Sequence, residues 1–325
     1  MPAVALFGAG RIGAIHAANV AAHSDLTLTY VVDPVAPAAE RLAAAHGARV
    51  AAAGDVLADA DVAGVIIASS TDTHLEHCLN AAAAGKAIFC EKPIDLGLAR
   101  ARAAAPALAL ARLLLGFNRR FDPQFQALKA QLDSGAVGKL ETLNIVSHDP
   151  APPSIDYVKV SGGLFRDMAI HDFDTARWLL GEPPTEVFAA ASCLVDPAIG
   201  AADDVDTAKI LLRTASGKLC LISNSRRSGY GYDQRIEAFG STGMVRAGNV
   251  TESALATWSE AGAAADRFQN FFLDRYADAY RLEMGHFAEV IAGAAPRVGL
   301  ADALAALELA EAAQASVRSG GPVRL

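Results

Sequence analysis

The sequence contains only four cysteines, and no two of them are close enough to form a C-x-x-C pair. They are Cys78, Cys90, Cys193 and Cys220. Zinc sites and redox motifs usually need closely spaced thiols, and disulfide frameworks are typical of short, cysteine-rich secreted chains. We therefore expect reduced thiols, a cytoplasmic protein and no metal site.

The sequence also lacks an excess of positive charge and any long apolar run. Lysine and arginine total 28 against 36 aspartates and glutamates, for a formal net charge of −8. Nucleic-acid binding usually needs clustered basic residues, and these are scattered. No apolar stretch reaches the roughly 18–20 residues that a membrane helix requires, and nothing near the N-terminus resembles a signal peptide. We expect neither a nucleic-acid partner nor a membrane segment.

The sequence does have the length and composition of a globular enzyme with two domains. Its 325 residues are 52% hydrophobic and 20% charged. Single hydrophobic cores usually stop growing near roughly 250–300 residues. Two domains are therefore the default expectation, and we place the boundary between residues 118 and 119.

The first part of the chain alternates short apolar runs with alanine-rich helical stretches. This alternation is typical of βαβ units around a parallel sheet. The expected strands are residues 3–8, 27–33, 62–68, 86–90 and 112–117. The expected helices are residues 11–22, 36–46, 73–84 and 97–108. Thr73 and Glu76 have the spacing of a capping box for the third helix. Residues 1–118 are thus predicted to form an α/β Rossmann domain.

The second part, residues 119–325, shows several consecutive strand patterns joined by short glycine turns. The expected strands are residues 140–147, 186–195, 205–213, 217–226 and 232–239. A helical segment is expected after Gly162-Gly163, and further helices at 277–292 and 300–318. Consecutive strands with tight turns indicate a mainly antiparallel sheet. We predict an α+β domain whose C-terminal helices could pack back on the first domain.

The most informative motif is Gly8-Ala9-Gly10-Arg11-Ile12-Gly13, which follows an apolar run and opens a helical pattern. In this context the first glycine permits a tight turn, the second lets backbone approach a pyrophosphate, and the third lets helix pack on strand. The helix N-terminus adds N–H donors. We expect cofactor contacts from Gly8, Gly10, Arg11, Ile12 and Gly13. The alternative is an ordinary glycine turn of an α/β protein.

An acidic residue at the end of the second expected strand completes the dinucleotide pattern. Asp33 follows the glycine loop at the usual interval of about 20 residues, and its carboxylate could accept both adenosine-ribose hydroxyls. A carboxylate there would repel a 2′-phosphate, which favours NAD over NADP. Arg11 weakens this argument slightly, because an arginine in the loop could reach such a phosphate.

A polar cluster follows the third expected strand, at the carboxyl edge where parallel sheets bind ligands. Ser69, Ser70, Thr71 and His74 are candidates to contact the pyrophosphate or the nicotinamide ribose. The same residues could equally be helix-capping groups.

Glu91-Lys92-Pro93 follows the next expected strand, again at a carboxyl edge. A lysine there can donate to a substrate hydroxyl and stabilise the alkoxide that develops as hydride leaves. The ordinary alternative is an exposed lysine in a loop.

The segment 162–174 carries a second candidate for chemistry. If it is helical, Asp167, His171 and Asp174 share one face, and a carboxylate can hold an imidazole that takes a proton. The alternatives are an Asp–His pair on a solvated helix or a two-ligand metal site, for which no third ligand is evident.

Taken in order, the glycine loop, Glu91-Lys92-Pro93 and the Asp167-x-x-x-His171-Asp172 segment resemble the glucose-fructose oxidoreductase/inositol dehydrogenase (Gfo/Idh/MocA) family. Two longer motifs, GFNRRFDP at 116–123 and SRRSGYGYDQR at 225–235, resemble its inositol 2-dehydrogenase branch. The resemblance covers essentially the whole chain. It implies a Rossmann domain followed by a domain with a large open sheet, commonly the interface of a homotetramer.

The resemblance also implies roles for individual residues. Lys92, Asp167 and His171 would form the catalytic group, and Glu91 and Lys92 would lie near the cofactor. The contacts to substrate hydroxyls would come from Lys92, Arg119, Asp167, His171, Asp174 and Tyr232. His148 is a departure, because another basic residue is expected there, and it could alter which polyol fits.

The expected reaction is NAD-dependent oxidation of a secondary alcohol of a cyclic polyol, first of all myo-inositol to 2-keto-myo-inositol. His171 would take the hydroxyl proton, Lys92 would stabilise the oxyanion and Asp167 would orient His171. The nearest alternative is the same chemistry on scyllo- or chiro-inositol or on an aldose. An inactive nucleotide-binding regulator is a further alternative, but it should have lost one of the three catalytic residues.

Overall fold

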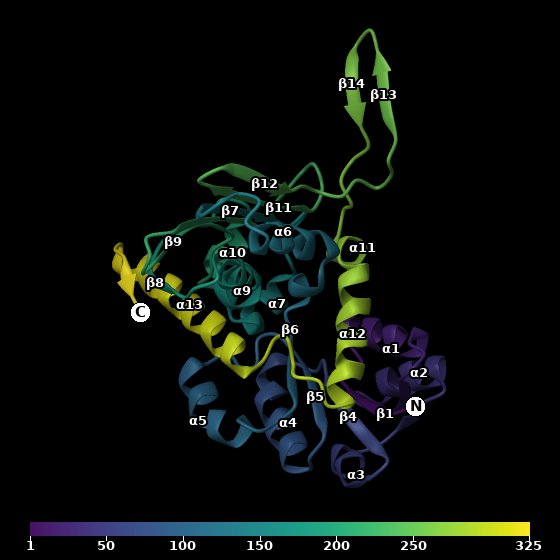
Figure 1. The fold of residues 1–325 in the computed structure, drawn as a ribbon. Coiled ribbons are helices and arrows are strands. Elements are labelled where there is room, and N and C mark those ends of the chain that lie inside the picture. The colour runs from purple at the N-terminus through teal and green to yellow at the C-terminus, as the bar shows by residue number, and fades with distance from the viewer. The chain divides into compact units, whose positions relative to one another are not determined.

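The computed structural model describes residues 1–325, which divide into two compact units (Figure 1). The first unit comprises Met1–Phe121 and Ala279–Leu307. The second comprises Asp122–Asp278 and Glu308–Leu325. The first break in the chain lies close to the predicted boundary, and a C-terminal segment belongs to the first unit.

The first unit is built on a six-stranded parallel sheet with the order β3-β2-β1-β4-β5-β6. The strands are β1 (Ala3–Phe7), β2 (Thr27–Val32), β3 (Arg49–Val50), β4 (Val62–Ile67), β5 (Ala87–Glu91) and β6 (Leu113–Gly116). The helices between them are α1 (Arg11–Ala22), α2 (Ala36–His46), α3 (Ala53–Ala58), α4 (Thr71–Ala83) and α5 (Leu98–Leu108), followed by the short 3₁₀ helix η1 (Asn118–Phe121). The predicted Rossmann fold is confirmed.

Two short elements of this unit, β3 and α3, were not predicted. Both residues of β3 are exposed, and α3 has a single buried residue, Val56. Segments this short carry no hydrophobic period to detect. The predicted capping box of α4 is wrong, because the helix begins at Thr71 and Thr73 lies inside its first turn. The Thr73 hydroxyl instead donates to the carbonyl of Ser70 at 2.7 Å.

The central strands of the first sheet are buried, as expected of a parallel sheet covered on both faces. Helix α12 (Ala277–Ile291) covers part of one face, where the ring of Phe287 lies 5.9 Å from that of Phe89. Gly64 makes room for it, since a Cβ there would lie 3.0 Å from Phe287. The strand order reverses between β1 and β4, and ligands bind at the carboxyl ends of strands at such a point.

The second unit contains a seven-stranded sheet with the order β12-β11-β7-β10-β9-β8-β15. The strands are β7 (Leu140–His148), β8 (Pro184–Ser192), β9 (Thr207–Thr214), β10 (Leu219–Ser225), β11 (Asp233–Gly240), β12 (Gly243–Ala247) and β15 (Val323–Arg324). Only the pairing of β10 with β7 is parallel. The predicted open, mainly antiparallel sheet is confirmed.

One face of this sheet is core and the other is open. Along β9, Ile210 and Leu212 are buried, whereas Leu211 between them is exposed. Helix α9 (Ala169–Leu180) packs against β7 and β10, and α13 (Leu300–Ser319) lies on the same side of the sheet (Figure 1). On the open face, strand register aligns Phe188, Leu211 and Leu221 in one exposed apolar row.

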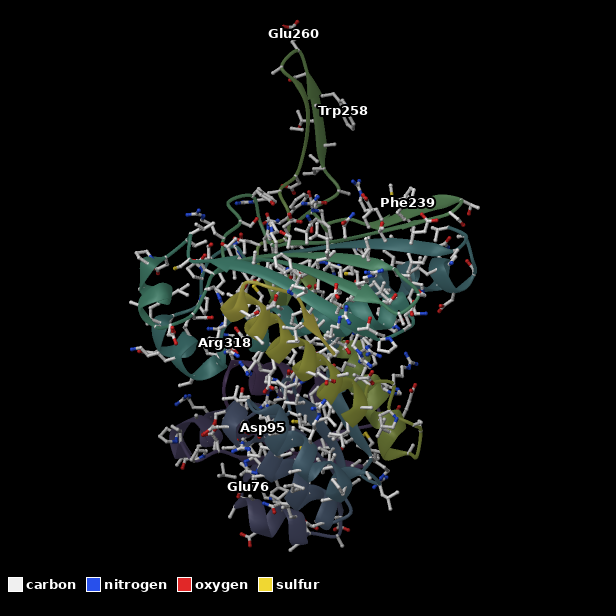
Figure 2. All side chains as sticks on the ribbon, turned by 90° about the vertical axis from the view of Figure 1, so that its left-hand side faces the viewer. Glu76, Asp95, Phe239, Trp258, Glu260 and Arg318 are labelled. Carbon is white, nitrogen blue, oxygen red and sulfur yellow. The ribbon has the colours of Figure 1, made fainter.

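The smaller helices of the second unit are α6 (Pro123–Asp133), α7 (Ile155–Ser161), α8 (Gly163–Asp167), α10 (Pro197–Ala201) and α11 (Phe272–Arg275). A separate hairpin, β13 (Ala256–Ser259) and β14 (Gly262–Ala265), projects from the unit with Trp258 on its side and Glu260 at its tip (Figure 2). Every residue from 254 to 265 is exposed. We call residues 250–269, which include this hairpin, the arm.

Candidate functional site

The glycine loop has the shape of a pyrophosphate cradle. Gly8 has φ of 105°, and a Cβ there would lie 2.4 Å from the carbonyl oxygen of Ala68. A Cβ at Gly13 would lie 2.0 Å from the carbonyl oxygen of Gly8. Helix α1 can therefore pack this close to the loop only because residue 13 is a glycine. At Gly10 a Cβ would meet nothing within 4 Å, which leaves this side of the loop open to a ligand. The loop therefore fits a dinucleotide.

Asp33 lies directly against this loop. Its Oδ2 accepts the N–H of Ala9 at 2.6 Å, and its Oδ1 accepts the N–H of Val35 at 2.8 Å. Arg11 and Ile12 form the first turn of α1 beside it. The structure thus brings the predicted loop residues and Asp33 together, with the carboxylate also bracing the loop.

The polar cluster after β4 lies beside Gly8 and partly holds the fold together. The Ser69 hydroxyl lies 2.7 Å from that of Thr73, while Ser70 and Thr71 begin α4. His74 is buried, and its two ring nitrogens lie 2.8 Å from the carbonyl oxygen of Pro93 and 3.1 Å from that of Ser69. His74 therefore ties two loops of the carboxyl edge to each other, and the contacts of this cluster to a cofactor stay predictions.

The turn that carries Lys92 is held from inside the first unit. The buried carboxylate of Glu91 accepts the N–H of Lys92 at 3.3 Å and lies 2.7 Å from Nε2 of His16, a residue of α1. Lys92 itself is half-buried. The Glu91 side chain thus positions the turn of Lys92 relative to the helix of the glycine loop.

A second carboxyl group near this turn was missed in the sequence. Glu283 of α12 is fully buried, and neither of its carboxyl oxygens has a hydrogen-bond partner. Tyr280, one turn earlier on the same helix, places its ring 5.8 Å from that of His16. Burial, and secondarily the charge of Glu91, raise the pKa of Glu283 well above its usual range. Only the packing of α12 reveals this pair, since the two glutamates are far apart in the chain.

In the second unit, the expected helical segment around Asp167 and His171 is divided by a one-residue break. Helix α8 ends at Asp167, and α9 begins at Ala169 after Met168, whose φ and ψ are −97° and −60°. The N–H of Met168 still donates to the carbonyl of Leu164, and that of His171 to the carbonyl of Met168. The predicted helical segment is thus present, but it is divided into two helices at Met168.

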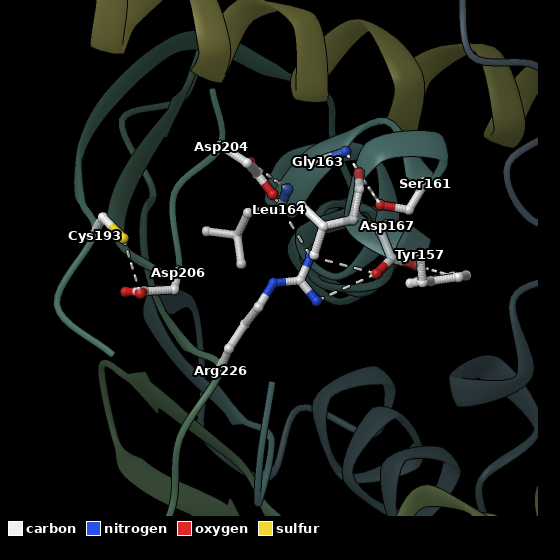
Figure 3. Close-up of polar contacts among 10 residues, drawn as sticks. Tyr157, Ser161, Gly163, Leu164, Asp167, Cys193, Asp204, Asp206 and Arg226 are labelled. Atoms are coloured by element: carbon white, nitrogen blue, oxygen red, sulfur yellow. Dashed lines mark hydrogen bonds and ion pairs between the residues drawn. The ribbon is translucent and has the colours of Figure 1, made fainter. Parts of the chain in front are cut away.

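The carboxylate of Asp167 is held from two sides (Figure 3). The Tyr157 hydroxyl donates to Oδ1 at 2.8 Å, and both terminal nitrogens of Arg226 lie 3.4 Å from Oδ2. Neither partner had been assigned a role from the sequence. The only available signal was that Arg226 lies in the longer motif at 225–235.

The loop that carries Tyr232 is tied down by the neighbouring Asp233. Tyr232 is buried and donates its N–H to the carbonyl of Gln269 at 3.1 Å. The Asp233 carboxylate accepts from Arg235, Asn249 and Tyr230. Burial alone would raise the pKa of Asp233, but these hydrogen bonds outweigh burial and hold it below its usual range. Tyr232 is thus fixed at the base of the arm.

The remaining two candidate substrate contacts are also buried. Asp174 is fully buried on α9 in the second unit, and Arg119 is buried in η1 of the first. Their contacts to a substrate stay predictions, as do those of Tyr232.

Comparison with known proteins identifies the family. Residues 3–116 match the model described as an oxidoreductase family with an NAD-binding Rossmann fold, and residues 125–246 match the GFO/IDH/MocA C-terminal domain. The chain belongs to the Gfo/Idh/MocA oxidoreductase family. The family is NAD-binding, so the protein is an NAD-dependent oxidoreductase, as predicted.

Relatives in this family match over nearly the whole chain. An inositol 2-dehydrogenase of Rhizobium meliloti (strain 1021) is 48% identical, over 96% of both chains. A myo-inositol 2-dehydrogenase of Thermotoga maritima is 43% identical, over 99% of this chain and 98% of the relative. The crystal structure of a myo-inositol dehydrogenase from Corynebacterium glutamicum superimposes with a TM-score of 0.95 at 43% identity, covering 99% of this chain and 98% of the other.

No group of three or more His, Cys, Asp or Glu side chains is arranged so that it could hold a metal ion. No helix combines the length and apolarity needed to cross a bilayer.

Proposed function

We propose that this Gfo/Idh/MocA enzyme oxidises a ring hydroxyl of myo-inositol to the ketone, with NAD as the oxidant. The observation that carries the proposal is the Asp167 carboxylate, braced by Tyr157 and Arg226 four residues before His171. A fixed carboxylate near an imidazole is the arrangement expected of a proton-accepting pair. The inositol dehydrogenases among the relatives support the choice of substrate.

The chemistry is divided among three side chains. His171 takes the proton of the substrate hydroxyl, and Asp167 orients the imidazole and balances the charge that it gains. Lys92 donates to the same oxygen and stabilises the negative charge that develops there. NAD, when bound, supplies the hydride acceptor. Gly8, Gly10 and Gly13 shape its pyrophosphate site, while Arg119, Asp174 and Tyr232 contact other substrate hydroxyls.

A second candidate substrate is another inositol isomer or an aldose. The observation that favours it is His148 at the end of β7, which lies 2.9 Å from the Ser223 hydroxyl. Burial lowers the pKa of His148 below its usual value, so this position offers a neutral group where a cation was expected. A site built around particular hydroxyls rejects the wrong stereochemistry strongly.

A substrate panel tests the proposal directly. The purified enzyme is assayed with NAD or NADP against myo-, scyllo- and chiro-inositol and several hexoses, with the reduced cofactor followed by absorbance. We expect the highest kcat/KM with myo-inositol and NAD. Preference for another isomer or an aldose would identify the second candidate, and a clear preference for NADP would contradict the role given to Asp33.

We also propose that the enzyme is a homotetramer located in the cytoplasm. The exposed row of Phe188, Leu211 and Leu221 on the open sheet face supports an interface between copies of the chain, because exposed apolar patches mark interaction sites. The arm supports it too, since an isolated two-stranded hairpin is only marginally stable in water. The four free cysteines are consistent with a reducing compartment.

Light scattering after gel filtration tests the assembly. Leu211→Lys places a charge in the middle of the apolar row and should reduce the mass from a tetramer to dimers or monomers. Leu110→Lys is the matched control, because Leu110 is 99% exposed in the first unit. A monomeric wild type, or an unchanged mass for Leu211→Lys, would contradict the proposal.

A further inference from the structure

Arg226 is a buried cation that faces two carboxylates (Figure 3). It is 1% exposed, its terminal nitrogens lie 3.4 Å from Oδ2 of Asp167, and one of them lies 4.0 Å from Oδ2 of Asp204. A buried guanidinium is costly unless anions compensate it. Here one cation serves two anions, so it offsets only part of the charge of Asp167.

The two carboxylates lie at opposite ends of α8. Asp204 accepts the N–H of Leu164 in the first turn at 3.0 Å, and a Cβ at Gly163 would lie 2.7 Å from the same carboxylate. Asp167 is the last residue of the helix. Arg226 therefore bridges the start and the end of this five-residue helix, and α8 cannot shift without breaking one of the two contacts.

Arg226 is itself anchored by the main chain. Its N–H donates to the carbonyl of Asp206 at 2.9 Å. The Asp206 side chain in turn accepts the N–H groups of Leu194, Val195 and Asp196. Because these hydrogen bonds fix the main chain at Arg226, its guanidinium is held in a defined position.

The groups that face Asp167 come from three separate segments. Tyr157 of α7 donates to one oxygen, and Arg226, after β10, contacts the other. Asp204, before β9, contributes a second negative charge that competes for Arg226. The Tyr157 hydroxyl orients the Asp167 carboxylate without adding charge. The Arg226 guanidinium also holds the carboxylate in place, and its positive charge weakens the negative potential that Asp167 exerts on its surroundings.

We infer that Arg226 is a positioning residue for the proposed catalytic pair, holding Asp167 in place and limiting how strongly it stabilises protonated His171. The inference rests on the proposed function. If Arg226 is removed, Asp167 holds the imidazolium more tightly and in a less defined geometry. The base is then available only at higher pH, and proton transfer slows.

The first experiment compares Arg226→Gln and Arg226→Lys with the wild type, measuring kcat, KM and the pH profile of kcat/KM with myo-inositol and NAD. We expect Arg226→Gln to lower kcat by about 10–100-fold and to move the acid limb upward by about one pH unit. The KM for NAD should not change. Arg226→Lys keeps the charge and should recover part of both effects.

The matched control is Arg166→Gln. Arg166 also belongs to α8, but its guanidinium contacts Gln314 at 2.6 Å and Glu311 at 3.5 Å rather than Asp167. This variant should leave the acid limb in place. If Arg166→Gln and Arg226→Gln give the same profile, the effect is general loosening of α8, and the inference is wrong.

A double-mutant cycle shows whether Arg226 acts through Asp167. In an Asp167→Asn background, Arg226→Gln should change kcat by less than about threefold, because residues that act as a unit are not additive. Full additivity would overturn the inference.

NMR titration of the His171 imidazole in wild type and Arg226→Gln tests the charge effect without turnover. The imidazole should titrate at higher pH in Arg226→Gln, which lacks the positive charge, and an unchanged titration in that variant would overturn the inference. A wild type inactive on every inositol would count against the proposed function alone.

Discussion

The two units hold their candidate functional residues in position in different ways. In the first unit the cofactor loop depends on main-chain geometry, since Gly8 and Gly13 make contacts that no side chain would allow. In the second unit Asp167 depends on side chains that reach it from other segments, Tyr157 and Arg226. Substitutions in the first site should therefore act by steric clash, and those in the second through charge and hydrogen bonding.

The same contrast holds for one buried carboxyl group of each unit. Asp206 of the second unit accepts N–H groups from three successive residues. Glu283 of the first has no hydrogen-bond partner. Burial raises the pKa of both, but for Asp206 the N–H donors of Leu194 and its neighbours prevail and lower its pKa to about 2. Hydrogen bonding, and not burial alone, decides which buried carboxyl is charged.

The largest effect is expected at His171, the proposed base in the second unit. His171→Ala should lower kcat by about 10²–10⁴-fold, because general-base catalysis contributes about that much. Steady-state assays with myo-inositol measure it, and His46→Ala, at the end of α2, is the control. Near-normal turnover of His171→Ala at neutral pH would show that another group takes the proton.

Two glycine variants distinguish a residue that shapes the cofactor loop from one that only leaves room for NAD. Gly13→Ala forces α1 away from Gly8 and should cost about 1–3 kcal/mol of unfolding free energy as well as NAD affinity. Gly10→Ala should weaken NAD binding while leaving stability nearly unchanged, because its Cβ meets no protein atom. Urea unfolding and calorimetric titration with NAD provide the two readouts. Equal loss of stability in both variants would contradict the distinction.

Asp206→Asn should destabilise the second unit by about 1–3 kcal/mol at pH 7, because three partly buried N–H donors lose a charged acceptor. The folded pKa of about 2 lies below the ordinary value of 3.8, so this stabilisation is present above pH 3.8 and is lost as pH falls through 2. The gap between wild type and variant in urea unfolding should therefore narrow on acidification. A gap independent of pH would contradict the charge-based explanation.

The smallest effect on stability is expected at Glu283. Its dependence on pH is opposite to that of Asp206, because the folded pKa is raised rather than lowered. A raised folded pKa means that the folded state keeps a proton that the unfolded state loses, so stability falls as pH rises above 4.5. Glu283→Gln should remove this slope and gain roughly 1 kcal/mol at pH 7 relative to pH 5. Melting temperatures from pH 5 to 8 measure it, with Glu76→Gln on α4 as the control. Parallel curves for wild type and Glu283→Gln would show that Glu283 is already ionised.

Much of the fold followed from local pattern. The strands and helices of the first unit, the glycine loop and Asp33 could be predicted because a hydrophobic period or a glycine conformation is encoded within a few consecutive residues. The short elements β3 and α3 and the arm could not, since alanine-rich or very short segments carry no such period. The break at Met168 likewise has no signal in the helical spacing of its neighbours.

The sequence alone therefore determined the family and its NAD-binding fold, and it predicted a lysine at a strand end and an Asp–His pair as the chemical groups. Only the tertiary structure decided what holds these groups. Arg226 lies 59 positions from Asp167 in the chain, and Glu91 lies 75 positions from His16. Contacts between such distant residues depend on how sheets and helices pack, and no short stretch of sequence encodes that packing.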